Sequence, residues 1–281
     1  MLKQRIITAL LMLALLVPAV FYPDSRAFTA VAVLLIAAAA WEWAKLNQCG
    51  PSAALAVGAV CGLLCIATWY VGVLALPLRM LWIVLGSAWV VLGAWLLRTG
   101  ASAWLEVPQV LRVVGGLFAL WAAWVAVAQA RMMGINFLFS VLVLVWVADI
   151  FAYACGRLWG GRLFKRKLAP SISPGKTWEG ALGGVLGVVV LALVWRLFDA
   201  DTSSHQASLY SRLSAGGMAF LVLAMFFLAA MSVVGDLVES LFKRSVGVKD
   251  SSALLPGHGG VLDRIDALLP VLPLAMMLAT L

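Results

Sequence analysis

Residues 135–154 read INFLFSVLVLVWVADIFAYA, a run of 20 residues with a single charged side chain. A helix of about 20 apolar residues spans the hydrocarbon core of a bilayer. Comparable apolar runs lie at about 5–22, 27–46, 53–71, 80–97, 113–130, 180–198, 214–235 and 266–281. We therefore predict an all-α, polytopic integral membrane protein with about nine transmembrane helices.

The composition of the whole chain supports this fold class. Of the 281 residues, 64% are hydrophobic and 11% are charged, whereas a soluble globular protein is about 25% charged. Continuous Leu, Ala, Val and Trp runs favour helices, because the strands of a membrane barrel alternate apolar and polar residues. The four cysteines form no CxxC pair and there are only two histidines, so the sequence predicts neither a disulfide framework nor a zinc site.

The basic residues predict the orientation in the membrane. With the N-terminus in the cytoplasm, the positive-inside rule is satisfied, because all Lys and Arg face the cytoplasm except Arg26, Arg79, Arg131, Arg196 and Arg212. Loops 157–178 and 237–264 are then both cytoplasmic. We interpret the net charge of +8 through this topology, and expect no nucleic-acid partner. The first apolar run is expected to be a retained helix, since no convincing cleavage site follows it.

Two regions of the chain differ in character. Residues 1–135 are rich in Trp, Leu and Ala with short loops, and we predict that they form a transmembrane scaffold. Residues 136–281 contain nearly all the clustered polar residues, and we predict that they form the catalytic region.

The first polar cluster runs from Asp149 to Gly180. Its basic run RLFKRK (162–167) fits contact with anionic headgroups. Its segment SPGKTWEG (173–180) predicts a tight turn that leads into a helix, and such a turn offers free N–H groups to an anion. A P-loop is excluded, because Pro170 stands where the first glycine belongs. Asp149, Tyr153 and Arg157 share one helix face, and either a structural bridge or a functional site explains them.

The second polar cluster spans residues 235–266 and is richer in carboxylates. Asp236, Glu239, Ser240 and Lys243 follow an i, i+3, i+4, i+7 spacing, which places them on one helix stripe. A glycine-rich turn, PGHGG (256–260), then allows the chain to return and bring Asp263 close to Asp236. Two adjacent carboxylates repel unless a cation lies between them, and their oxygens suit Mg²⁺. A salt-bridged, solvated loop is the competing interpretation.

The stretch from Ser240 to Asp266 resembles the signature of phosphatidate cytidylyltransferases, also called CDP-diacylglycerol synthases. That signature runs S-x-x-K-R, four residues, K-D, and closes with H-G-G-x-x-D-R-x-D. The segments SPGKTWEG and AY-x-x-GR-x-x-G (152–160) also resemble this family, so the similarity covers about the C-terminal 130 residues. The fixed positions of the signature are met by Ser240, Lys243, Arg244, Lys249, Asp250, His258, Gly259, Gly260, Asp263, Arg264 and Asp266.

The resemblance implies an activity and a location. The cytidylyl group of CTP would be transferred to phosphatidate, giving CDP-diacylglycerol and pyrophosphate with Mg²⁺ as cofactor, in phospholipid biosynthesis. The enzyme would be a multi-pass protein of a bacterial-type inner (cytoplasmic) membrane, with its active site facing the cytoplasm. A homodimer is a further hypothesis for this protein.

The resemblance also implies roles for individual residues. The metal ligands would be Asp236, Asp263 and Asp266. The substrate-binding residues would be Arg157, Ser173, Lys176, Thr177, Ser240, His258 and Arg264. The catalytic set would be Asp236, Lys243, Arg244, Lys249 and Asp263.

Three other classes of membrane protein compete with this hypothesis. A transporter would carry its charged residues across the membrane midplane, whereas here they cluster towards one side. A CDP-alcohol phosphatidyltransferase would carry a D-G-x-x-A-R…G-x-x-x-D-x-x-x-D pattern, which is absent. A CTP-dependent lipid kinase is chemically closer, and it would release CDP instead of pyrophosphate.

Overall fold

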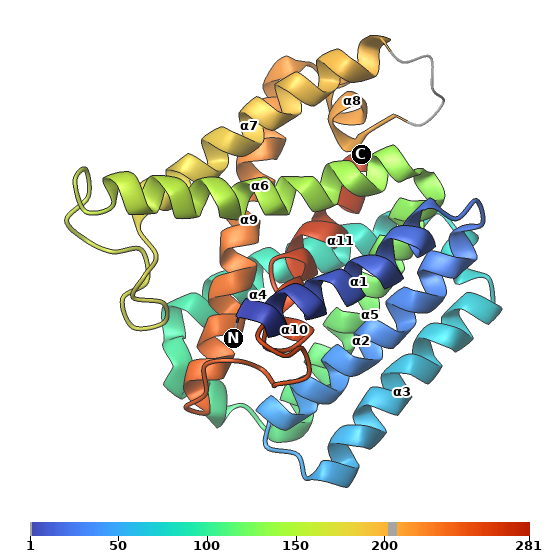
Figure 1. Ribbon diagram of the computed structural model, residues 1–281, viewed down its shortest axis with the longest axis vertical. Helices are drawn as coiled ribbons and strands as arrows, with labels where there is room; N and C mark the ends of the chain where they lie inside the picture. Colours follow the sequence, from blue (N-terminus) through green and yellow to red (C-terminus); the bar gives the residue numbers. More distant parts are fainter. Residues whose placement is uncertain (1, 202–206) are drawn as a thin grey trace.

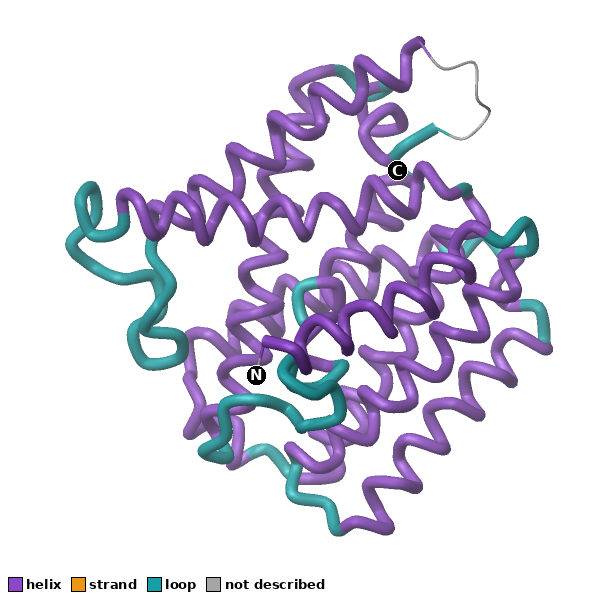
Figure 2. Tube along the Cα trace, viewed as in Figure 1, coloured by secondary structure: helices purple, strands orange, loops and turns teal. Residues whose placement is uncertain are grey.

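The computed structural model describes residues 2–201 and 207–281. Within these residues every regular element is a helix, joined by short loops and two longer ones (Figure 2). The helices are α1 (Leu2–Phe21), α2 (Ser25–Leu46), α3 (Pro51–Tyr70), the 3₁₀ helix η1 (Val73–Ala75), α4 (Arg79–Glu106), α5 (Gln109–Met133), α6 (Ile135–Trp159), α7 (Trp178–Asp201), α8 (Leu209–Ser214), α9 (Met218–Ser245), α10 (Leu262–Ile265) and α11 (Leu268–Ala279).

Eight of the described helices, α1 to α7 and α9, are long and apolar enough to cross a membrane. The predicted all-α, polytopic class is therefore confirmed. The last predicted span, 266–281, folds differently, because α11 has 12 residues and is only about 18 Å long. Most of α11 is buried, and it packs against α4, α5 and α9. It acts as a core helix that supports the longer ones.

The ends of the helices fall into two groups (Figure 1). The beginning of α1, the α2–α3 and α4–α5 connections and the two longest loops lie towards the lower left of the view. The α1–α2 and α5–α6 connections and the C-terminus lie towards the upper right. This alternation agrees with the predicted grouping of basic loops at one end. The cytoplasmic location of that end stays a prediction.

Two helices of the C-terminal half are longer than their apolar cores. The apolar core of α6 was predicted to end at 154, yet the helix continues to Trp159 and so includes Arg157. The apolar core of α9 was predicted to end at 235, yet the helix continues to Ser245. Residues 237–245 are therefore helix, and the predicted polar stripe from Asp236 to Lys243 lies on one continuous helix, as its spacing indicated.

Glycines bring the helices around the polar residues into close contact. A Cβ atom on Gly180 of α7 would lie 2.7 Å from the carbonyl oxygen of Ala152 in α6. A Cβ atom on Gly235 of α9 would lie 2.6 Å from the carbonyl oxygen of Asp266. Real side chains do not tolerate these distances, so the glycines permit both approaches. The second contact places Asp236 next to the start of α11.

Candidate active site

A cavity of about 520 Å³ lies between α6, α7, α9 and the loop that precedes α7. It combines residues of the two polar clusters, which are far apart in the sequence. From α6 the lining includes three residues spaced four apart, which share one helix face. The polar and charged lining residues are Asp149, Tyr153, Arg157, Lys176, Thr177 and Asp236.

An ion pair joins the two clusters at the wall of this cavity. Lys176 Nζ lies 2.7 Å from Asp236 Oδ2, and both side chains are partly buried. The Ser240 hydroxyl donates to the other oxygen of Asp236 at 3.3 Å. The predicted anion turn and the predicted acidic stripe therefore meet at Asp236.

The loop 160–177 is held against α9 by apolar and polar contacts. Ile172 is buried with Leu237 and Leu241 of α9. Arg244 Nε donates to the carbonyl oxygen of Ile172 at 3.4 Å. Arg244 is therefore near the first loop, and it is exposed on the outer face of the site.

The SPGKT segment forms the tight turn that its sequence predicted. The N–H of Lys176 donates to the carbonyl oxygen of Ser173 at 3.1 Å. The Thr177 hydroxyl accepts the N–H of Gly180 at 3.1 Å and so caps the start of α7. The turn thus fixes the backbone of Lys176, whose ammonium group faces Asp236.

Tyr153 and Arg157 interact as neighbours on α6. Arg157 Nη1 donates to the Tyr153 hydroxyl oxygen at 2.8 Å. Both side chains line the cavity together with Asp149. The pattern predicted either a structural bridge from Asp149 or a functional site, and their place on the cavity wall favours the second interpretation.

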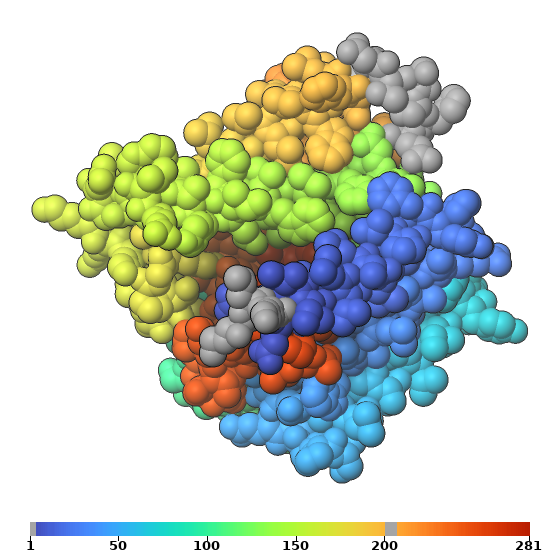
Figure 3. Space-filling view, in the orientation of Figure 1, coloured from blue at the N-terminus to red at the C-terminus, as the bar shows by residue number. Residues whose placement is uncertain are grey.

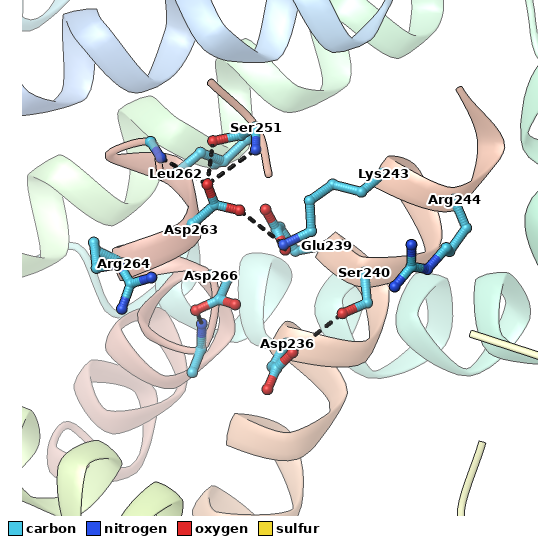
Figure 4. Close-up of polar contacts among 12 residues, drawn as sticks. Asp236, Glu239, Ser240, Lys243, Arg244, Ser251, Leu262, Asp263, Arg264 and Asp266 are labelled. Carbon is cyan, nitrogen blue, oxygen red and sulfur yellow. Dashed lines mark hydrogen bonds and ion pairs between the residues drawn. The ribbon is translucent and has the colours of Figure 1, made fainter. Parts of the chain in front are cut away.

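A second network surrounds Lys243, in the last turn of α9 (Figure 4). Its ammonium group pairs with Glu239 and with Asp263 Oδ1 at 2.7 Å. The other oxygen of Asp263 accepts the N–H groups of Ser251 at 2.9 Å and Gly260 at 2.7 Å. Burial by itself would raise the pKa of Asp263, but the bonds from Lys243 and the Gly260 N–H outweigh it and lower the pKa to about 2.

The HGG sequence is required by the close approach of this loop to its carboxylates. Gly259 has a φ of +83°, and a Cβ atom there would lie 2.7 Å from Asp263 Oδ2. A Cβ atom on Gly260 would lie 2.1 Å from the Ser251 hydroxyl oxygen. Only glycine satisfies both positions.

Two predicted substrate-binding residues, His258 and Arg264, and the predicted catalytic residue Lys249 lie outside this network. The N–H of His258 donates to the carbonyl oxygen of Leu255 at 2.8 Å, which fits a residue in a turn. Arg264 Nε donates to the carbonyl oxygen of His258 at 3.0 Å. Arg264 and Lys249 are exposed. The structure therefore places Lys249 and Arg264 outside the lining of the 520 Å³ cavity.

Acidic groups outnumber the lysines inside this region. Asp266 follows α10, and its pKa is raised to about 7 by burial and by the negative charges of Asp236 and Asp149. Lys176 and Lys243 are the ammonium groups that pair with the acidic side chains here. A further cation would relieve the remaining repulsion. The acidic side chains of the region are Asp149, Asp236, Glu239, Asp263 and Asp266.

The donor set fits Mg²⁺ bound partly by substrate. Within residues 2–201 and 207–281, no three His, Cys, Asp or Glu side chains already converge as a preformed metal site. Magnesium in nucleotide enzymes is usually held by one or two carboxylates together with substrate phosphates. Asp266 can provide one carboxylate, and Asp236 can provide a second if Lys176 moves from it to a substrate phosphate. Asp263 is engaged by Lys243, Ser251 and Gly260, so it would bind a metal only if Lys243 moved. The metal roles of all three aspartates stay predictions.

A buried residue that contacts this site was not predicted from the sequence. Glu42 of α2 is fully buried and accepts hydrogen bonds from the 251–262 segment. It belongs to the region predicted to be scaffold alone. Its signal was a carboxylate inside an apolar span, which is costly in a membrane helix and calls for a partner.

Comparison with known proteins agrees with these motifs. The model of the cytidylyltransferase family matches residues 3–281. The chain belongs to this family. The match covers the N-terminal helices as well, so it extends well beyond the C-terminal motifs.

The relatives share one name. A phosphatidate cytidylyltransferase of Pseudomonas aeruginosa is 36% identical over 287 residues, covering 97% of this chain and 95% of that protein. A phosphatidate cytidylyltransferase of Haemophilus influenzae is 47% identical over 140 residues, covering 50% of this chain and 44% of that protein. One of Bacillus subtilis is 39% identical over 148 residues, covering 53% of this chain and 49% of that protein.

Proposed function

We propose that this member of the cytidylyltransferase family transfers the cytidylyl group of CTP to phosphatidate, giving CDP-diacylglycerol and pyrophosphate. One observation carries the proposal: the Lys176–Asp236 ion pair lies at the wall of a polar cavity between membrane-spanning helices. A polyanion would bind the basic residues of this wall, and a lipid would enter between the helices. The three relatives described above are named for phosphatidate as their substrate.

The reaction needs positioning more than it needs a catalytic base. A phosphate oxygen of phosphatidate is already ionised near neutral pH, so it can attack the α-phosphorus of CTP directly. The bond between the α- and β-phosphates breaks, and pyrophosphate leaves with the electron pair. Two polyanions must meet in line, so catalysis depends on holding them and offsetting their charge.

The basic residues of the cavity are suited to hold these phosphates. Lys176 and Arg157 line it and would bind phosphate oxygens. The Ser173 and Thr177 hydroxyls would add neutral donors, whereas the N–H groups of Ser173 and Lys176 are already bonded within the loop. Lys243 lies outside the cavity lining and is held between two carboxylates, so it would bind CTP phosphates only by leaving one of these partners.

Asp236 and Asp266, with Asp263 if Lys243 moves, would hold Mg²⁺. Mg²⁺ held by these carboxylates would supply positive charge against the negative charge that develops on the departing pyrophosphate. Ser240 would keep Asp236 oriented, since its hydroxyl already donates to that carboxylate.

The cytoplasmic face of an inner membrane is the proposed location. CTP would arrive from the cytoplasm and the lipid from the bilayer. In Figure 3 the surface is hollowed between α6 and α1, with the C-terminal segment at the floor, which would give a lipid access from the side. A homodimer remains a hypothesis, and mass measurement of the protein in detergent would test it.

A product assay tests the function. Purified protein, phosphatidate, Mg²⁺ and CTP labelled at the α-phosphate should give labelled CDP-diacylglycerol and one pyrophosphate per lipid. Labelled CDP released without labelled lipid would assign the chain to the lipid kinases, and no turnover of CTP would favour a transporter.

Cysteine labelling in intact cells tests the orientation. Single cysteines at Ser171 and Ala253, both exposed positions, should resist an impermeant reagent added outside, in a background without other thiols. Ser251 is unsuitable for this purpose because it is buried and bonded to Asp263. Ready labelling at either position would show that the predicted orientation in the membrane is wrong.

A further inference from the structure

Glu42 lies far from the catalytic motifs in sequence and inside an apolar helix. Its neighbours in α2 are Trp41 and Trp43, and its own side chain is fully buried. Removing a carboxylate from water is costly unless donors surround it. A helix that only spans the membrane needs no such residue, because its backbone is already satisfied. The position therefore calls for a specific partner.

The donors that surround Glu42 come from the C-terminal loop. The N–H groups of Val261 and Leu262 lie 3.0 and 2.7 Å from its two oxygens. The Ser252 hydroxyl donates at 2.6 Å, and the Ser251 hydroxyl lies at 3.3 Å. An ionised carboxylate accepts hydrogen bonds at both oxygens, whereas an amide would turn its NH₂ group towards one set of donors.

The contact is possible only because residue 260 is glycine. A Cβ atom on Gly260 would lie 2.5 and 2.6 Å from the two oxygens of Glu42. The HGG sequence therefore allows the loop to meet two carboxylates, Asp263 on one side and Glu42 on the other.

Ser251 connects Glu42 to the Lys243 network. Its hydroxyl lies 2.8 Å from Asp263 Oδ2 and 3.3 Å from Glu42. One hydroxyl proton serves one of them at a time, and the shorter distance favours Asp263. The N–H of Ser251 also donates to Asp263, so the placement of this residue sets the placement of the Asp263 carboxylate.

We propose that Glu42 is a positioning residue for the reaction. It fixes the 251–262 segment against α2, this segment fixes Asp263, and Asp263 holds Lys243 in place. Glu42 does not line the 520 Å³ cavity, so it acts through these groups. The inference rests on the proposed function, and it makes the N-terminal half a working part of the site.

Hydrogen exchange and kinetics on the purified full chain test this role. Glu42→Gln keeps the size and loses an acceptor, so exchange should accelerate in residues 250–262 alone. We expect kcat to fall about tenfold or more, with KM for CTP and for phosphatidate changing less than about threefold. Glu42→Asp keeps the charge and should recover part of kcat. Glu106→Gln, an exposed glutamate at the end of α4, is the matched control and should behave as wild type.

Two results would overturn the proposal. The first is unchanged exchange in 250–262 in a folded Glu42→Gln protein. The second is faster exchange across all helices, with wild-type kcat in the fraction that stays folded. If Glu42→Gln yields no folded protein, Ser252→Ala decides, because it removes one donor. It should show the same local exchange with a loss of kcat of about twofold to threefold, and wild-type exchange there overturns the role.

The exchange readout is independent of catalysis. If the wild-type protein makes no CDP-diacylglycerol, the proposed function fails, while exchange in 250–262 still decides whether Glu42 holds this segment.

Discussion

Two long loops lie at one end of the molecule, 160–177 and 246–261, and in each a buried glutamate accepts backbone N–H groups. The two glutamates differ in how far along the sequence they lie from the groups that they bind. In the first, Glu179 accepts the N–H groups of Leu163 and Phe164 at 3.0 and 2.9 Å, from 16 and 15 residues away. In the second, Glu42 accepts the N–H groups of Val261 and Leu262 from 219 and 220 residues away. Both glutamates are buried.

The first contact is local in the sequence, and the second is long-range. The first loop and its glutamate form one continuous segment with α7, so this contact forms whenever the segment folds. The second loop is correctly placed only when α2 has packed beside α10. Both loops lead to α9, where Asp236 pairs with Lys176 of the first loop and Lys243 pairs with Asp263 of α10, which follows the second loop.

The largest effect is expected at Asp236, where the first loop joins α9. Asp236→Asn keeps the size and loses the charge, so both the Lys176 pair and the proposed metal ligand are lost. We expect kcat/KM to fall about a thousandfold, which is about 4 kcal/mol, in a protein that still folds and inserts. Asp24→Asn is the control, because Asn caps α2 as well as Asp does. Near-wild-type turnover and Mg²⁺ dependence of Asp236→Asn would remove this residue from the site.

Asp263→Asn tests the contacts of the second loop, and we expect it to lower activity slightly less than Asp236→Asn does. The variant should lose about a hundredfold or more in kcat, because an amide that keeps its oxygen towards the Ser251 and Gly260 N–H groups turns its NH₂ group towards Lys243, which then loses a charged partner. Residues of one catalytic unit are not additive, so the double variant with Asp236→Asn should be little worse than Asp236→Asn alone. If the two losses multiply in steady-state assays, the two loops serve separate sites.

Lys176→Ala is expected to lower kcat/KM by about tenfold to a hundredfold, since it removes one charge from the cavity but leaves the turn in place. Lys165→Ala, an exposed lysine of the same loop, should cost less than about twofold. The comparison of these two variants at matched expression separates a phosphate site from general attraction to anionic lipid. Equal activity would make the SPGKT turn a plain connection.

The smallest effect is expected for Glu179→Gln. An amide keeps one acceptor oxygen, and the Leu163 and Phe164 N–H groups both use the same oxygen of Glu179. We expect faster hydrogen exchange in 160–168 and a loss of kcat of about threefold or less. A loss of kcat as large as that of Glu42→Gln would show that the two glutamates matter equally, whatever their separation in sequence from the loops that they bind.

Several features of the site follow from patterns within single segments. The i, i+3, i+4, i+7 spacing placed Asp236, Glu239, Ser240 and Lys243 on one helix stripe, and α9 shows it. The SPGKT turn was also predicted correctly. In each case the relevant contacts lie within one helix or between consecutive segments, where periodicity and turn chemistry decide the outcome.

The pairing of charges was not predictable in the same way. The sequence led us to expect Asp236 beside Asp263, whereas each is paired with a different lysine, Lys176 and Lys243. Which lysine pairs with which aspartate depends on how α9 is rotated about its axis and on where the 246–261 loop crosses it. Similarly, 266–281 has the composition of a span, but it forms a short buried helix because neighbouring helices surround it.

The sequence by itself determined that this protein crosses a membrane many times, which family motifs it carries and which end gathers its basic loops. These properties depend on composition, periodicity and local spacing, so each span and each motif can be recognised within a short segment of the chain. Only the tertiary structure decided which carboxylate meets which lysine and that Glu42 holds the 251–262 segment. A buried charge must find partners wherever the packing places them, and that packing is a property of all the helices together.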